Sequence, residues 1–459
     1  MSRRKPFAGS QRGLVIAFDV GTTFSGVSYS VLDPGVEPEI KGVTRFPGQS
    51  PGGSSKIASV LYYDATGVAR AIGAETQLPS VIEQAEDEQW TKVEWFKMHL
   101  RPNSDTSQPA YKHIPSLPPN KSLVEVLADF LQYLLACTKS FVEETMLPDG
   151  VHFWDSVKDR IIFVLSHPNG WEGAQQSYMR RASVLAGLVT NDPEDQGRIH
   201  FVTEGEASLH FCVNNGLRIA EDEGIVILDA GGGTIDLSAY SSGSGKTISF
   251  KEISRSECCF AGSIFVTEES RTYLRDKLRG TDFYGDVPRI TDIFDQTSKL
   301  QFRNSDEPSF VRFGGRDQTD PTLNIRSGQM KIPGPDVARF FEPSIKAALK
   351  AVVKQRSDAR KTITSVFLVG GFAASPWLFS KLRDGLQPLG LSIHRPDTHV
   401  NKAVSDGAVS FYLDHYVTGR VSRWSYGLKC WTRYNAHDTE HQRRGYITDD
   451  ISGKLKVVK

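Results

Sequence analysis

The sequence Leu-Val-Ile-Ala-Phe-Asp-Val-Gly-Thr-Thr at residues 14–23 returns in a related form as Ile-Val-Ile-Leu-Asp-Ala-Gly-Gly-Gly-Thr at residues 225–234. Each copy is an apolar run that ends in an aspartate, Asp19 or Asp229, and continues into a turn of glycine and threonine. Apolar and small polar residues alternate after each turn, which predicts a second strand and therefore an antiparallel hairpin. The repeat predicts one structural unit used twice, so that two acidic hairpin tips face each other across a cleft.

The composition indicates a soluble globular protein without a charge bias. The chain has 459 residues, of which 54 are basic and 54 acidic. This balance gives no electrostatic reason to expect a nucleic acid or a membrane surface as partner. No apolar run is long enough for a signal peptide or a membrane span, and the five cysteines form no CxxC pair. We therefore expect a protein with reduced thiols in the cytoplasm, or in the nucleus as well.

The pattern of apolar residues predicts how the rest of the chain is organised. A flexible tail at 1–12 precedes a first lobe at 13–222, with an insertion at about 35–155. A second lobe at 223–415 holds an insertion at about 265–355, and 416–459 form a short extension. Helical spacing and stop signals predict helices at 122–144, 175–187, 336–355 and 376–386. Strands are expected at 160–166 and 365–369, and peripheral loops or small insertions at 101–120 and 303–330.

The hairpin tips carry the residue types that hold a nucleoside triphosphate with Mg²⁺. Glycine lets backbone N–H groups approach phosphate oxygens, threonine adds hydroxyls, and carboxylates hold a hydrated metal ion. The first tip supplies Asp19, Gly21, Thr22 and Thr23, and the second supplies Asp229, Gly231, Gly232, Gly233, Thr234 and Asp236. One such hairpin alone would be an ordinary turn capped by its aspartate, but two matched hairpins favour phosphate binding.

Three segments resemble known motifs in their order and spacing. Residues 19–26, 229–236 and 368–376 resemble the phosphate-1, phosphate-2 and adenosine motifs of the actin-like ATPase superfamily. From about residue 13 to 415 the chain is most similar to divergent members of the 70-kDa heat shock protein family of chaperones. The resemblance implies an α/β fold with two lobes, in which duplicated ribonuclease-H-like domains surround a nucleotide cleft.

The same resemblance assigns roles to individual residues, with ATP or ADP and Mg²⁺ as cofactors. It makes Lys97, Glu204, Asp229 and Thr234 catalytic, and it gives the metal to Asp19 and Asp229, mainly through water. The residues that resemble nucleotide-binding positions are Asp19, Gly21, Thr22, Thr23, Gly231, Gly232, Gly233, Thr234, Gln296, Lys299, Gly370, Gly371 and Phe372. Simpler alternatives stay open: a surface lysine for Lys97, a helix N-terminal carboxylate for Glu204, and a tight turn at 370–371.

The sequence also departs from the family pattern. Gln296 stands in place of an acidic residue, Leu300 in place of an arginine and Phe372 in place of a serine, so we expect an altered adenine pocket. Residues 417–459 are too few for the complete substrate-binding domain of the family.

The function that these residues favour is that of an ATP-binding, chaperone-like protein. We expect slow, Mg²⁺-dependent ATP hydrolysis that controls a conformational switch, with an unfolded-protein client or a co-chaperone as partner. Neither a nucleic acid nor a membrane is expected. Two alternatives remain: a nucleotide-binding interaction module with little turnover, and a sugar- or acetate-type kinase of the same superfamily.

Overall fold

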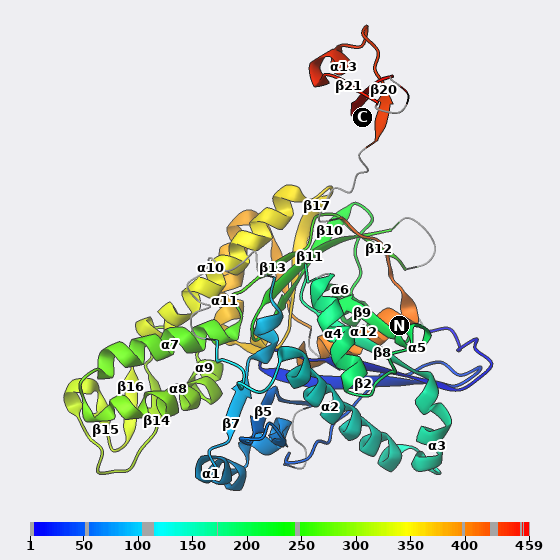
Figure 1. Ribbon diagram of the computed structural model, residues 1–459. Coiled ribbons are helices and arrows are strands. Elements are labelled where there is room, and N and C mark those ends of the chain that lie inside the picture. Colours follow the sequence, from blue (N-terminus) through cyan, green and yellow to red (C-terminus); the bar gives the residue numbers. More distant parts are fainter. Residues whose placement is uncertain are drawn as a thin grey trace. The chain divides into compact units, whose positions relative to one another are not determined.

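The computed structural model describes residues 4–50, 55–102, 114–171, 173–243, 248–396, 400–422, 430–449, 452 and 454–458. The chain forms two compact units, Met1–Val421 and Ser422–Lys459. The larger unit contains both copies of the sequence repeat, and many of its elements are labelled in Figure 1. Most of the polar stretch at 101–120 lies outside the described residues.

The first hairpin opens a mixed sheet. Its strands are β1 (Gly13–Asp19), β2 (Phe24–Leu32), β3 (Lys41–Gly42), β4 (Lys56–Ala58), β8 (Ile161–His167) and β9 (Ile199–Thr203). Their order is β3-β2-β1-β8-β9, and β4 pairs with the start of β2 outside this path. β1 and β2 are antiparallel with Asp19 opposite Gly26, whereas β1, β8 and β9 run parallel.

The second hairpin opens a second mixed sheet. Its strands are β10 (Glu223–Ala230), β11 (Ile235–Ser242), β12 (Phe250–Glu252), β13 (Glu257–Cys259), β17 (Thr362–Val369), β18 (Ser392–His394) and β19 (Val417–Gly419). Their order is β18-β17-β10-β11-β12-β19, and β13 pairs with the start of β11. β10 and β11 are antiparallel with Asp229 opposite Asp236, whereas β10, β17 and β18 run parallel.

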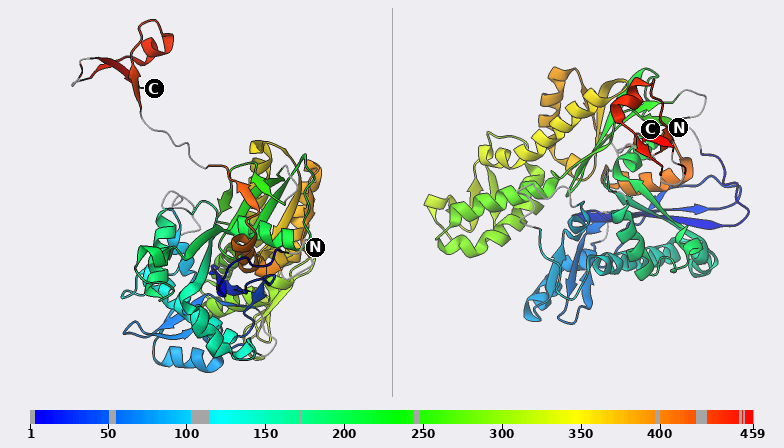
Figure 2. Two further views of the ribbon diagram at one scale, coloured as in Figure 1. Left: turned by 90° about the vertical axis from the view of Figure 1, so that its right-hand side faces the viewer. Right: turned by 45° about the horizontal axis from the view of Figure 1, so that its top comes forward.

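The two sheets correspond strand by strand. The order β3-β2-β1-β8-β9 matches β12-β11-β10-β17-β18, and the directions of the paired strands match as well. β4 and β13 occupy equivalent places beside β2 and β11. Figure 2 shows the two sheets in different parts of the larger unit, the first drawn in blue and teal and the second in green to orange. The repeat in the sequence therefore does encode one unit used twice, and the two-lobed α/β fold is confirmed.

Helices cover both faces of each sheet. Those that matter most for the site are α2 (Leu123–Thr145), α3 (Gly150–Val157), α4 (Ala174–Leu185), α6 (Glu204–Asn214), α7 (Ser263–Leu278), α10 (Gly334–Asp358), α11 (Pro376–Leu386) and α12 (Ala403–Asp414). α2 begins at the predicted N-cap, because the Ser122 hydroxyl and the Glu125 side chain form a capping box. The predicted helices at 175–187, 336–355 and 376–386 and both predicted strands are also present, as α4, α10, α11, β8 and β17.

The central strands are apolar at nearly every position because both of their faces are buried. In β1, Leu14, Ile16 and Phe18 join the core beneath α2 and α4, whereas Val15 and Ala17 pack with α12. β10 repeats the arrangement, with alternate residues facing the core of α10 and α11 or the core of α6. Successive side chains of a strand point to opposite faces, so a continuous apolar run is required here.

α6 and α12 connect the two sheets at the centre of the larger unit. α12 packs on β1, β2 and β8 of the first sheet, α6 packs on β10 and β11 of the second, and the two helices contact each other. Gly407 of α12 makes this contact close, since a Cβ there would collide with the backbone carbonyl of Ala207 in α6. The seam between α6 and α12 is therefore a closely packed contact between the helices of the two lobes.

Smaller elements extend each lobe. The first lobe adds a sheet of β5 (Val60–Tyr63), β6 (Ala69–Ile72) and β7 (Thr91–Glu94), with α1 (Pro79–Asp87) and, near β9, α5 (Pro193–Gln196). The second adds β14 (Ser309–Arg312), β15 (Ile325–Arg326) and β16 (Gln329–Ile332), with α8 (Val287–Gln296) and α9 (Ser298–Gln301). The polar stretch at 303–330 thus forms a small structured insertion.

In the part that the structure describes, the smaller unit contains a three-stranded sheet and one short helix. Its elements are β20 (Trp431–Arg433), α13 (Thr439–Arg444), β21 (Ile447–Thr448) and β22 (Leu455–Val458). Across the described residues of both units, no helix has the length and apolar character that a membrane span requires.

Candidate nucleotide site

A cavity of about 710 Å³ lies where the two hairpin tips meet. The expected residues that line it are Asp19, Gly21, Thr22, Thr23, Lys97, Glu204, Asp229, Gly231, Gly232, Gly233, Thr234, Gly370 and Gly371. The walls also include Phe24, Lys56, Ala374, Asn401 and Val404, which sequence reasoning missed. Segments far apart in the chain thus converge on one concave site of the size that ligand pockets usually have.

The two tips are in direct contact through their small residues. A Cβ on Gly232 would collide with the hydroxyl of Thr23, and one on Gly233 with that of Thr22. The carbonyl oxygens of residues 231–233 accept hydrogen bonds from the backbone N–H groups of residues 262–264, at the start of α7. These carbonyls are therefore directed at α7, where they would not repel a phosphate in the cavity.

Gly370, directly after β17, forms part of the cavity wall beside Asp229. Its φ of +93° lies in a region that favours glycine. A Cβ at this position would also collide with Oδ1 of Asp229 and with the carbonyl of Ala230. Both the conformation and the close approach require glycine, so the residue does more than end a strand.

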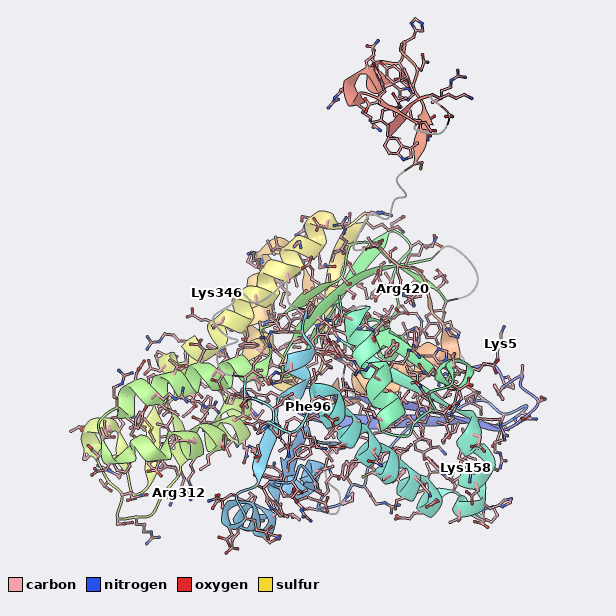
Figure 3. All side chains as sticks on the ribbon, in the orientation of Figure 1. Lys5, Phe96, Lys158, Arg312, Lys346 and Arg420 are labelled. Carbon is pink, nitrogen blue, oxygen red and sulfur yellow. The ribbon has the colours of Figure 1, made fainter. Side chains whose placement is uncertain are left out.

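Lys97 lies at the floor of the cavity and is buried. Its Nζ is 2.5 Å from Oε1 of Glu204, the first residue of α6. The short 3₁₀ turn that carries it, Phe96–Leu100, follows Trp95, which has a left-handed φ of +55°. Phe96, labelled in Figure 3, anchors this turn by packing on Phe130 of α2, with 5.5 Å between ring centroids. The strained backbone and the aromatic anchor aim Lys97 at the cleft, so it is not a surface lysine.

The charges at this floor are set by burial and by one another. Burial by itself lowers the pKa of Lys97, but Glu204 and Asp19 raise it by more, so the ammonium group stays protonated. Burial raises the pKa of Asp229 to about 7, and the nearby Glu204 adds to the effect. The hydroxyl of Ser208 opposes this shift by donating to Oδ2 of Asp229 at 2.6 Å. The cavity lining contains three carboxyl groups, those of Asp19, Glu204 and Asp229, and two lysines, Lys56 and Lys97.

Asp19, at the end of β1, has two partners. Oδ2 lies 2.6 Å from Nζ of Lys56, and Oδ1 accepts a weak hydrogen bond from Ser166 at 3.3 Å. Lys56 comes from β4, and no motif in the sequence marked it. Its side chain is only 14% exposed and lies in the wall of the cavity.

Asp236, the last residue of the second motif, does not line the cavity. It is buried, and its Oδ1 accepts a hydrogen bond from the backbone N–H of Asn169 at 2.6 Å. The Asn169 amide nitrogen also lies 3.1 Å from the carbonyl oxygen of Leu237 and 3.2 Å from that of Glu257. Asn169 directly follows His167-Pro168, so this segment of the first lobe is fastened to the second sheet beside the site.

Three expected nucleotide contacts lie outside the cavity. Phe372 is buried and stacks on Phe341 of α10, at 6.1 Å between ring centroids. Lys299 is also buried and pairs with Asp295, while its Nζ lies 3.3 Å from the hydroxyl of Thr267. Gln296 is exposed. The structure does not bring these three side chains to the cavity wall.

Known proteins with similar sequences share one family. Heat shock 70 kDa protein 12A of Mus musculus is 24% identical over 506 aligned positions, which cover 92% of this chain and 72% of the mouse protein. Over most of its length the chain is thus similar, at low identity, to a divergent 70-kDa heat shock protein. Heat shock 70 kDa proteins 12A and 12B of Homo sapiens are 28% and 25% identical, each over 43% of this chain and 28% of the human protein. No protein-family model matches the chain.

The carboxylates suit a magnesium ion that is held mostly by water and phosphate. Asp19 and Asp229 offer hard oxygen ligands, and burial together with the nearby Glu204 and Asp19 raises the pKa of Asp229, so a bound cation would favour its ionised form. Among the described residues, no three His, Cys, Asp or Glu side chains form a metal-binding group. Mg²⁺ commonly keeps several waters and needs only one or two carboxylates, so this sparse set fits the ion that the heat shock family resemblance implies.

Proposed function

We propose that the protein binds ATP and hydrolyses it slowly with Mg²⁺, as a chaperone-like switch controlled by nucleotide. The observation that carries this proposal is the cavity between the hairpin tips, which places the buried Lys97–Glu204 pair beside Asp229. The similarity to heat shock 70 kDa protein 12A, together with the resemblance to actin-like ATPase motifs, supports nucleotide binding.

The proposed chemistry relies on positioning and electrostatics. Backbone N–H groups and the hydroxyls of Thr22, Thr23 and Thr234 bind phosphate oxygens, because glycine tips leave them accessible. Lys97 stabilises negative charge that builds on the terminal phosphate, and Glu204 orients the attacking water. Asp19 and Asp229 would hold Mg²⁺ mainly through water, and the bound ion would neutralise phosphate charge.

The switch follows from the two lobes that surround the cavity. A nucleotide that contacts both hairpin tips binds the closed arrangement better than an open one, so it shifts the population towards closure. Loss of the terminal phosphate removes contacts shared by both tips. The partner that senses this change is proposed to be an unfolded-protein client or a co-chaperone.

The first experiment measures nucleotide binding by thermal unfolding of the purified chain. At about 100 times its dissociation constant, ATP with MgCl₂ should add about 2.7 kcal/mol to the free energy of unfolding. Absence of any shift with ATP, ADP or GTP at millimolar concentration would contradict nucleotide binding.

The second experiment measures phosphate release by Glu204→Gln, with Glu83→Gln on the exposed face of α1 as the control. Glu204→Gln should keep the thermal shift but release phosphate about 100-fold more slowly, because it loses the group that orients water. Release at the wild-type rate would refute the role of Glu204. A wild-type chain that binds ATP without turnover would support the interaction module, and a phosphorylated sugar product would support the kinase.

A further inference from the structure

Lys56 is a cation in the cleft that no motif assigns. It lies on β4, directly opposite Gly26 of β2, which in turn lies opposite Asp19 of β1. The Lys56 side chain thus crosses β2 at Gly26, and its ammonium group lies 2.6 Å from Oδ2 of Asp19. Together with Lys97, it is one of two ammonium groups that line the cavity.

The local structure holds this lysine in place. Gly26 leaves space for its aliphatic stem, since a Cβ there would lie 3.2 Å from Cγ of Lys56. The side-chain amide of Gln49 donates to the Lys56 carbonyl at 3.0 Å and fixes the strand. The aliphatic stem of Lys56 is thereby buried along β2, and its charged end forms part of the cavity wall.

The two lysines have different surroundings. Lys97 is buried against Glu204, and this carboxylate neutralises much of the positive charge of Lys97. Lys56 neutralises Asp19 from the side of the cavity. The family resemblance assigns this same carboxylate to Mg²⁺. An ammonium group has three donors, so Lys56 can keep its bond to Asp19 and donate to a phosphate oxygen as well.

We propose that Lys56 acts as a built-in counter-cation at Asp19, which lets the cleft hold nucleotide phosphates without Mg²⁺. This inference rests on the proposed nucleotide site and deepens it. Without the metal, Lys56 keeps Asp19 from repelling the phosphates; with the metal bound, its contribution to affinity is small. Binding of nucleotide is therefore only weakly dependent on Mg²⁺, whereas hydrolysis can still require the ion.

The test compares the affinity for a fluorescent ATP analogue in MgCl₂ and in EDTA. For the wild type, the dissociation constant should rise by less than about tenfold when EDTA replaces MgCl₂. Lys56→Gln keeps a donor for Asp19 but removes the charge, so its dissociation constant in EDTA should rise by at least a further factor of about ten, with little change in MgCl₂. Lys56→Arg should restore most of the affinity in EDTA.

Matched controls separate this role from a structural one. Lys41→Gln removes a lysine of β3 whose side chain is 52% exposed, and it should behave as wild type in both buffers. Thermal unfolding without nucleotide checks that each variant is folded. Equal losses of affinity by Lys56→Gln in MgCl₂ and in EDTA would overturn the proposal, as would wild-type binding that disappears in EDTA. Binding that fails in both buffers would instead refute the nucleotide site itself.

Discussion

Glu252 should make the larger unit less stable above neutral pH than below it. This residue ends β12, and its Oε2 accepts a hydrogen bond from the backbone N–H of Val421 at 2.7 Å. The titratable and charged groups around it are Glu206 of α6, Tyr240 of β11 and Arg420, which is labelled in Figure 3. Burial raises the pKa of Glu252 from 4.5 to about 7, and Glu206 contributes to the rise although Val421 and Arg420 oppose it.

The size of the effect follows from the two pKa values. Because the folded pKa lies above the unfolded one, the folded state binds the proton more tightly and loses stability as the pH rises between them. A gap of about 2.5 units corresponds to about 3 kcal/mol, at about 1.36 kcal/mol per unit. The loss is negligible well below pH 4.5 and complete above pH 7, and about 2.5 kcal/mol of it falls between pH 5 and pH 8.

Urea denaturation of the wild type and of Glu252→Gln at pH 5 and pH 8 measures this loss. Glutamine keeps an oxygen that can accept from Val421 but has no proton to lose. The wild type should therefore lose about 2.5 kcal/mol more than the variant over this range. Glu39→Gln, at a side chain that is 77% exposed, should change nothing. If Glu252→Gln and wild type show the same pH dependence, Glu252 does not titrate near neutrality and the reasoning fails.

Two further predictions concern contacts between the lobes. Gly407→Ala should lower the free energy of unfolding by about 1–2 kcal/mol, because overpacking against the Ala207 carbonyl outweighs the better helix propensity of alanine. In the control Gly385→Ala of α11, the three atoms nearest to the new methyl group belong to the side chain of Leu349, which can shift, so the free energy of unfolding should stay nearly unchanged in the same urea titration. Equal losses in the two variants would refute the close packing of α6 against α12. Asn169→Ala should cost about 2–3 kcal/mol through lost hydrogen bonds of the amide group to the second sheet, measured in the same way. A urea unfolding curve of Asn169→Ala identical to that of the wild type would show that these hydrogen bonds do not hold the two lobes together.

The repeated hairpins could be predicted from the sequence because their signals are local. An apolar run, an aspartate and a glycine turn are contiguous, so residues 14–23 and 225–234 reveal both strands and tips without knowledge of the rest. The N-cap of α2 is local in the same sense, since Ser122 and Glu125 are three residues apart. The position of Glu204 in the cavity was anticipated only through the family resemblance.

The remaining parts of the site depend on strand pairing and on packing. Lys56 reaches Asp19 only because β4 pairs with β2 in one register, and nothing within the segment around Lys56 encodes that pairing. Asn169 of the first lobe contacts Leu237 of the second only because the two lobes pack together, and no local sequence signal encodes this contact. Phe372 follows the expected Gly370-Gly371 turn, but its large apolar side chain gains more by packing on Phe341 than by lining a cavity.

The duplicated sheets are alike in backbone but unlike in charge at the site. One row of facing residues crosses the first sheet at the hairpin tip, and it consists of Asp19, Gly26 and Lys56. The equivalent row of the second sheet contains Asp229, Asp236 and a cysteine of β13. The first row neutralises its aspartate, whereas the second contains two buried aspartates and no cation. Burial is the largest cause of the raised pKa of both aspartates, and Glu204 adds to it. The duplicated fold therefore gives the candidate site one aspartate that is paired with a lysine and one that is not paired with a lysine of its own row, and this difference lies in side chains rather than in the fold.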